Sequence, residues 1–395
     1  MTTQHVLKGF LLSAAIGLCL SAPPASAGGA GAGVVAMQAS ASAQLQARAA
    51  QFLARLTPAQ QDRLRSGALA KVEITDEWSE LVQNAIDPGS YQCNPDSPFK
   101  AWIKGQVAQI DPVALNAAGS MGGLSLPAAD AVVFGSESKS NTFGVNGEYT
   151  HLLTSEIKDL RRFWDIHTAD IQLIPMHGAD VFSSVDRIAR AYEFGFGLPH
   201  ADAQEAAGVM YELIHTTPSL QGGKHPLFSL NAFAVPDQGP GSGITDRVIM
   251  GDGILQAMAG IGLGDVAPRA ILAHEFSHQV QFDDNLFDSP LTGAEATRRT
   301  ELMADAFGTY FLTHARGEAL NAKRLLPSEQ AFYAVGDCNF AYGGHHGTPN
   351  QRLRASTWGA DLANGAQKQG FILPSLVLDA DFEQELPVLV APDAQ

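Results

Sequence analysis

The sequence predicts an α+β protein that is mostly helical and carries a small mixed sheet. Apolar residues recur at helical spacing in several stretches, namely 44–84, 152–164, 185–194 and 202–214. Strand-like runs, rich in β-branched and aromatic residues, are short and few, namely 131–134, 142–145, 171–176, 227–235 and 247–251. With 395 residues, 45% of them hydrophobic and 17% charged, the chain is long enough to bury a large core.

The first 27 residues have the pattern of a secretory signal peptide. Lys8 precedes an apolar run at 10–20, and Ala25-Ser26-Ala27 matches an A-x-A cleavage site. No later run reaches the ~18 to 20 apolar residues needed to span a bilayer. We therefore expect residues 1–27 to be removed and the mature protein to be periplasmic or extracellular, without a membrane span. Its formal net charge of −16 argues against nucleic acid as a partner.

Composition divides the rest of the chain into four stretches. Residues 28–43 are rich in Gly, Ala and Ser and are expected to form a flexible leader. Residues 44–86 are predicted to be helical, with Thr57-Pro58-Ala59-Gln60 as a capping box, and are either a propeptide or a cap on the main domain. The main domain is expected at 87–369, and the acidic, Pro-interrupted stretch 370–395 is expected to pack as a tail.

The segment 270–281 contains the pattern H-E-x-x-H within a predicted helix. His274 and His278 stand four residues apart, so their imidazoles leave the same face of that helix one turn apart. This spacing lets two ring nitrogens bind one metal ion, and Zn²⁺ is the usual one. Glu275 lies beside the pair and is expected to reach a water molecule rather than the metal. The same short pattern also occurs by chance in helices that bind no metal.

A second predicted helix follows, beginning near Thr292 with another capping-box pattern. Glu301 and Asp305 stand one turn apart on one face of it. Glu301 is predicted to be the third metal ligand, and Asp305 to accept the other ring N–H of a ligating histidine. The alternative is that the two carboxylates form a solvated acidic face. The apolar residues between and around them argue against that alternative. Gly308, on the same broad face, is expected to let two helices approach closely.

Together these motifs resemble the gluzincin arrangement of zinc metallopeptidases, H-E-x-x-H followed by E-x-x-x-D. With the later run His346-Gly347-Thr348-Pro349-Asn350-Gln351-Arg352, they are similar to bacterial neutral zinc metallopeptidases. Ser277 stands where those proteins commonly carry a small residue, often Gly. The resemblance covers 265–359, about a quarter of the chain. It implies a zincin-like fold, one zinc ion per chain, and a peptide or protein substrate.

In such an enzyme, Glu275 would act as general base during hydrolysis of the peptide bond. The developing oxyanion needs a further donor, for which Tyr342, His345, His346 and Tyr310 are the candidates. A strand within 227–235 or 247–251 could offer an unpaired edge to the substrate backbone. Two other hypotheses remain open. The chain could be a zinc-binding zincin-fold envelope protein with a binding or chaperone-like role and little turnover, or its metal could be structural and closed by a fourth protein ligand.

Two cysteines remain after signal-peptide cleavage, Cys93 and Cys338. An oxidising compartment favours a disulfide between them. The alternatives are that the thiolate of Cys93 masks the zinc in a latent form, or that Cys338 is a metal ligand.

Overall fold

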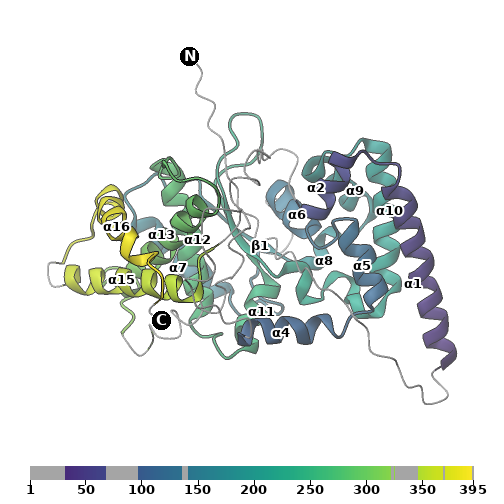
Figure 1. The fold of residues 1–395 in the computed structure, drawn as a ribbon, viewed down its shortest axis with the longest axis horizontal. Coiled ribbons are helices and arrows are strands. Elements are labelled where there is room, and N and C mark those ends of the chain that lie inside the picture. Colours follow the sequence, from purple (N-terminus) through teal and green to yellow (C-terminus); the bar gives the residue numbers. More distant parts are fainter. Residues whose placement is uncertain are drawn as a thin grey trace. The chain divides into compact units, whose positions relative to one another are not determined.

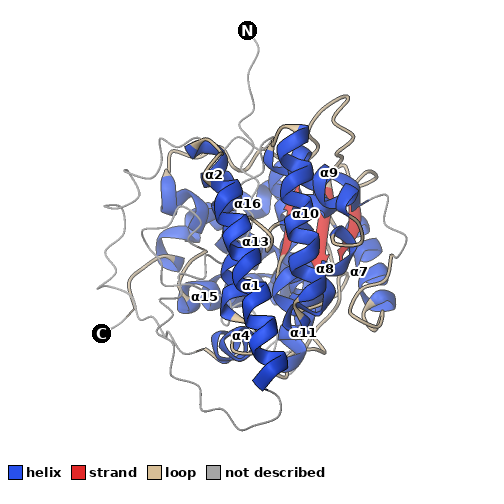
Figure 2. Cartoon of the chain, turned by 90° about the vertical axis from the view of Figure 1, so that its right-hand side faces the viewer, coloured by secondary structure: helices blue, strands red, loops and turns tan. Residues whose placement is uncertain are grey.

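The computed structural model describes residues 32–67, 97–135, 141–321, 324, 346–367 and 370–393. Within them the chain is mostly helical and has one three-stranded sheet, in agreement with the predicted α+β class (Figures 1 and 2). The chain forms two compact units, each assembled from three separate segments. We call residues 1–73, 105–138 and 176–231 the helical unit, and residues 74–104, 139–175 and 232–395 the motif unit. No helix in the described ranges is long and apolar enough to cross a membrane.

The helical unit contains helices and short 3₁₀ turns. They are α1 (Ala32–Leu53), α2 (Pro58–Ser66), α5 (Pro112–Ser120), α6 (Leu126–Phe134), α8 (Gly178–Val181), α9 (Val185–Phe196), α10 (His200–Thr216), η4 (Pro218–Gly223) and η5 (Pro226–Ser229). The capping box at the start of α2 is confirmed, since Thr57 and Gln60 bond each other's backbone N–H. Helix α1 begins at Ala32, so most of the expected flexible leader is helical, as its alanine content favours.

The motif unit contains the sheet and the longest buried helices. Its elements are α7 (Thr150–Phe163), β2 (Ala232–Val235), β3 (Arg247–Gly251), α11 (Asp252–Gly260), α12 (Ala267–Asp283), α13 (Gly293–Thr313), α15 (Pro349–Gln367) and α16 (Ser375–Leu389). α4 (Pro98–Val107) and β1 (Gln172–Met176) lie across the boundary between the units. The strand order is β1-β3-β2, and β2 runs antiparallel to β3 with Phe233 opposite Ile249.

Two predicted strands are wrong and a third is shortened. Residues 131–134 lie in α6, because a short buried apolar run does not distinguish a strand from a helix by periodicity alone. Residues 142–145 form no strand, and the turn that follows them leads directly into α7. In the run 227–235 only the second half is a strand, since Pro226 starts a 3₁₀ turn.

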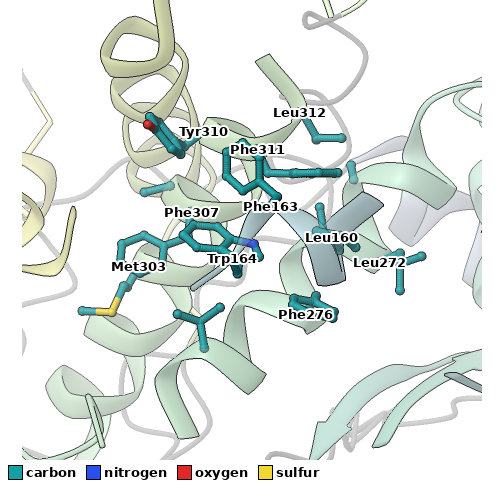
Figure 3. Packing of buried hydrophobic residues seen from close by; sticks show 14 of the residues in the cluster. Leu160, Phe163, Trp164, Leu272, Phe276, Met303, Phe307, Tyr310, Phe311 and Leu312 are labelled. Atoms are coloured by element: carbon teal, nitrogen blue, oxygen red, sulfur yellow. The ribbon is translucent and has the colours of Figure 1, made fainter. Parts of the chain in front are cut away.

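The core of the motif unit is built around α12 and α13, against which α7 and α16 pack. Figure 3 shows the part of this core where residues of α7 meet those of α12 and α13. The ring of Trp164 stacks on that of Phe307 at 5.5 Å between centroids, and Phe163 meets Phe311 edge-on at 5.1 Å. All of α13 except Glu295 is buried. The 370–395 tail contributes α16 to this core through an apolar face that includes Phe382.

Glycines set the spacing of the helices around the two motifs. A Cβ at Gly308 of α13 would lie 3.1 Å from the backbone nitrogen of His274, so the expected close approach of α12 and α13 is confirmed. On the other side of α13, a Cβ at Gly359 of α15 would lie 2.2 Å from the carbonyl oxygen of Ala306. The backbones of α12, α13 and α15 are therefore in near contact where the polar motif residues lie.

Candidate metal centre

Helix α12 begins at Ala267 with Pro268 in its first turn, and it carries the H-E-x-x-H residues on a buried stretch. Val266 is its N-cap. The rings of His274 and His278 face each other edge-on, with their centroids 4.9 Å apart. One potential ligand atom from each of His274, Glu275 and His278 lies within 4.8 Å of the others. The i, i+4 spacing therefore brings both imidazoles to one place, as predicted.

Helix α13 brings Glu301 to the same place. One carboxylate oxygen of Glu301 lies 3.5 Å from Nε2 of His274, and the other lies 3.5 Å from Nε2 of His278. Glu301 is 3% exposed, and the two histidines are 6% and 5% exposed. The alternative of a solvated acidic face is therefore wrong for Glu301, and also for Asp305, which is fully buried.

The spacing of these donors fits a tetrahedral metal ion. Two atoms each bound at ~2.0–2.1 Å to a tetrahedral zinc lie ~3.4 Å apart, close to the separation of Glu301 from each Nε2. Two imidazoles with one carboxylate are also a donor set that zinc accepts while a fourth position stays open. Glu301 is the better third ligand than Glu275, because its two oxygens face both histidines at once.

The other ring nitrogen of each histidine has a partner of its own. Nδ1 of His274 lies 2.8 Å from Oδ1 of Asp305, as expected from the sequence. Nδ1 of His278 lies 2.9 Å from Oε1 of Gln281, whose Nε2 donates to the carbonyl of Thr300 at 2.8 Å. These acceptors hold a proton on each Nδ1, so Nε2 is the ring atom that can bind a metal once it has lost its own proton.

Sequence reasoning assigned no role to Gln281 or Arg352. Gln281 follows His278 by three residues in α12, a spacing that could have identified it as a helical neighbour. Arg352 lies in the first turn of α15 and bonds both oxygens of Asp305, at 2.7 and 2.6 Å. It lies within the H-G-T-P-N-Q-R run, but only the folded chain brings it to Asp305, 47 residues earlier.

The pKa values of the two glutamates in the site are shifted in opposite directions. Burial would raise the pKa of Glu301, but the charge of His346 and hydrogen bonds from His274 and His278 hold it well below its ordinary value. Burial raises the pKa of Glu275, against the opposing charges of the two histidines. Burial would lower the pKa of His274, yet the bonds to Asp305 and Glu301 raise it to about 10. Glu301 is thus an anion suited to a cation, whereas Glu275 is the more basic carboxylate.

Of the remaining residues that the sequence singled out, one lies near Glu301, one lies in the apolar core and four are outside the described residues. His346 lies close enough to Glu301 for its charge to depress the pKa of that carboxyl. Tyr310 does not serve the site, because its ring is in the apolar core and its hydroxyl accepts the N–H of Leu373 at 2.9 Å. Four other predicted residues lie outside the described residues, namely Tyr342, His345, Cys93 and Cys338.

Comparisons of the chain with protein-family models, with curated proteins and with solved structures found no match. The fold and the site therefore define the chain only at a general level, as an α+β protein with a buried two-histidine, carboxylate group that could hold a metal ion.

Proposed function

We propose that the protein is an exported zinc-dependent peptidase with a zincin-like catalytic half. One observation carries this proposal, namely that both Nε2 atoms of the H-E-x-x-H pair converge on the carboxylate of Glu301 at 3.5 Å. Each Nδ1 is held by a separate acceptor, as in a site prepared for a metal. The zinc ligands would be His274, His278 and Glu301.

Bound there, zinc would supply Lewis-acid chemistry, which acidifies a water molecule and polarises a scissile carbonyl. Glu275 would take a proton from the attacking water and pass it to the leaving amine. Burial raises its pKa, and a higher pKa makes a carboxylate the stronger base. We propose His346 as the donor to the oxyanion, because among the described candidates its charge acts on Glu301, with Tyr342 and His345 as the alternatives.

The sheet offers a place for the substrate. β3 is the central strand, so of the two strands considered from the sequence only β2 is at an edge of the described sheet. Helix α12 packs against β2, and Gln279 of α12 donates to the carbonyls of Val235 and Arg247 at 3.2 and 2.8 Å. We propose that an extended peptide binds along the outer edge of β2.

The test is zinc content by elemental analysis, with hydrolysis of a casein or peptide-library substrate followed in the same samples. Wild type should hold one zinc per chain and hydrolyse the substrate. Glu275→Ala should keep zinc and lose activity by at least ~10²-fold, whereas Glu301→Ala should lose zinc. Glu295→Ala, in the first turn of the same helix as Glu301, is the matched control and should change neither.

Other outcomes would redirect the assignment. Zinc retained in wild type without hydrolysis would favour a binding or chaperone-like envelope protein. Zinc retained equally in Glu301→Ala would remove that residue from the ligand set. Wild type that takes up no zinc when it is supplied would refute the metal centre.

A further inference from the structure

Arg352 makes a contact that the proposed mechanism does not use. Its guanidinium donates from Nε to Oδ2 of Asp305 at 2.7 Å and from Nη2 to Oδ1 at 2.6 Å. Arg352 is 3% exposed and Asp305 is fully buried, so water competes little for either group. Oδ1 of Asp305 is also the atom that faces Nδ1 of His274 at 2.8 Å. One carboxylate thus links the arginine to a candidate metal ligand.

The planar fork of Arg352 fixes the plane of the Asp305 carboxylate, because two parallel N–H donors bind its two oxygens. Once that plane is fixed, the lone pair of Oδ1 that accepts from His274 has one direction. The direction of this hydrogen bond sets the rotation of the imidazole, and the rotation sets where Nε2 points. Arg352 therefore acts on the ligand atom through two hydrogen-bonded steps.

The start of α15 is built to hold Arg352 in place. Thr348 and Gln351 form a reciprocal cap, with Thr348 N–H donating to Gln351 at 3.0 Å and Gln351 N–H donating to Thr348 at 3.2 Å. Pro349 fills the first helical position, and Gly347 precedes the cap with a φ of +93°. A Cβ at Gly347 would lie 3.6 Å from Cγ of Arg352, so the turn packs against the stem of that side chain.

We propose that Arg352 is a positioning residue for the metal ligand His274 and acts through Asp305, an inference that rests on the proposed metal centre. A merely structural role accounts less well for the pair, because a buried ion pair adds little stability over apolar residues of similar size. In this proposal, the turn from Gly347 to Arg352 holds the guanidinium against Asp305, the partner of His274.

The test is a double-mutant cycle on zinc affinity, measured by competition with a chelator of known affinity. The variants are Arg352→Gln, Asp305→Asn and the pair together. Each single variant should bind zinc ~10- to 100-fold more weakly than wild type, as the loss of an outer partner does elsewhere. Because Arg352 acts through Asp305, the double variant should be no weaker than Asp305→Asn alone. Additive losses would overturn the proposal, and so would unchanged affinity in Arg352→Gln.

Further variants separate geometry from charge and from folding. Arg352→Lys keeps the charge but not the fork, so it should stay impaired; full recovery would mean that charge alone matters. Arg354→Gln is the matched control, since Arg354 on the same helix bonds Asp393 and the carbonyls of Leu389 and Ala391. Its zinc affinity should equal that of wild type.

A second measurement uses Co²⁺ in place of zinc. The visible absorption of the Co²⁺-loaded protein should change in Arg352→Gln and not in Arg354→Gln, because it reports ligand geometry. If Arg352→Gln does not fold, Arg352→Lys takes its place in the cycle, since it keeps a cation beside the buried carboxylate of Asp305. Failure of wild type to bind zinc would instead refute the metal centre itself.

Discussion

At the scale of single residues, the site is defined by what holds the ring nitrogens of its two histidines. His274 has a charged acceptor, Asp305, and His278 has a neutral one, Gln281. The pattern of the sequence was enough to predict the first, because Glu301 and Asp305 repeat the i, i+4 spacing of the histidines. It was not enough for Gln281, since glutamines at helical spacing are common and most of them face solvent.

Replacing Gln281 by Leu should weaken zinc binding ~10-fold or more. Leucine has a similar volume but no acceptor, so Nδ1 of His278 and the carbonyl of Thr300 would both lose a partner. Chelator competition measures the effect, with Gln384→Leu at an exposed position of α16 as the control. Equal zinc affinity in Gln281→Leu and wild type would show that His278 needs no such support.

A second residue-scale prediction concerns Glu156, which is fully buried on α7. Burial raises its pKa well above the ordinary value, the charge of Glu318 raises it further, and Arg269 opposes them from 3.7 Å. A carboxyl whose folded pKa is raised favours folding most below its unfolded pKa of ~4.3, and that stability is lost as pH rises through the folded pKa. Burial therefore disfavours the charged form of Glu156 at this position.

Glu156→Gln should accordingly raise the unfolding temperature more at pH 8 than at pH 5, by about 2–4 °C for each kcal/mol saved. Thermal unfolding of metal-free protein at both pH values measures this difference. Asp361→Asn, which changes an exposed carboxyl on α15, should show no such pH dependence. A larger gain at pH 5 than at pH 8 would contradict the sign of the argument.

At the scale of elements, α12, α13 and α15 pack closely because glycines, which have no side chain, stand where their backbones meet. Gly308 and Gly359 bring α12, α13 and α15 into near backbone contact. Short sequence patterns predicted α12 and α13 well, because the metal motif, an early proline and apolar neighbours agree on a helix. They failed at cap chemistry, since Thr292 is the N-cap of α13 but makes no side-chain cap bond.

Gly359→Ala should destabilise the motif unit by about 1–3 kcal/mol, because the added Cβ would meet the Ala306 carbonyl oxygen at 2.2 Å. A Cβ at Gly365 on the same helix would have nothing within 4 Å, so Gly365→Ala should instead stabilise α15 by ~1 kcal/mol. Denaturant unfolding of the two variants tests the contrast. Equal effects would mean that α13 and α15 are not in close contact.

At the scale of the whole molecule, the chain passes from one unit to the other five times along its length. Composition predicted one continuous main domain at 87–369, and neither unit coincides with that span. Two of the five crossing points, at 105 and 176, fall within α4 and β1, and a third, at 232, coincides with the start of β2, so no linker composition marks these three. Local patterns report helices and motifs, whereas unit membership depends on contacts between distant segments.

This division leads to a prediction about zinc. All the proposed ligands and their outer partners, from His274 to Arg352, belong to the motif unit. A ligand stabilises the state that binds it by RT ln(1 + [L]/Kd), ~2.7 kcal/mol at 100 times Kd, and only in the part that unfolds with the site.

Zinc should therefore slow amide hydrogen exchange in α12, α13 and the start of α15, and leave α1, α9 and α10 in the helical unit nearly unchanged. Mass-spectrometric exchange with zinc, with Mg²⁺ as the control ion and with Glu301→Ala as the control variant, measures this. Uniform protection of both units would mean that they unfold together, and protection confined to the helical unit would place the metal elsewhere.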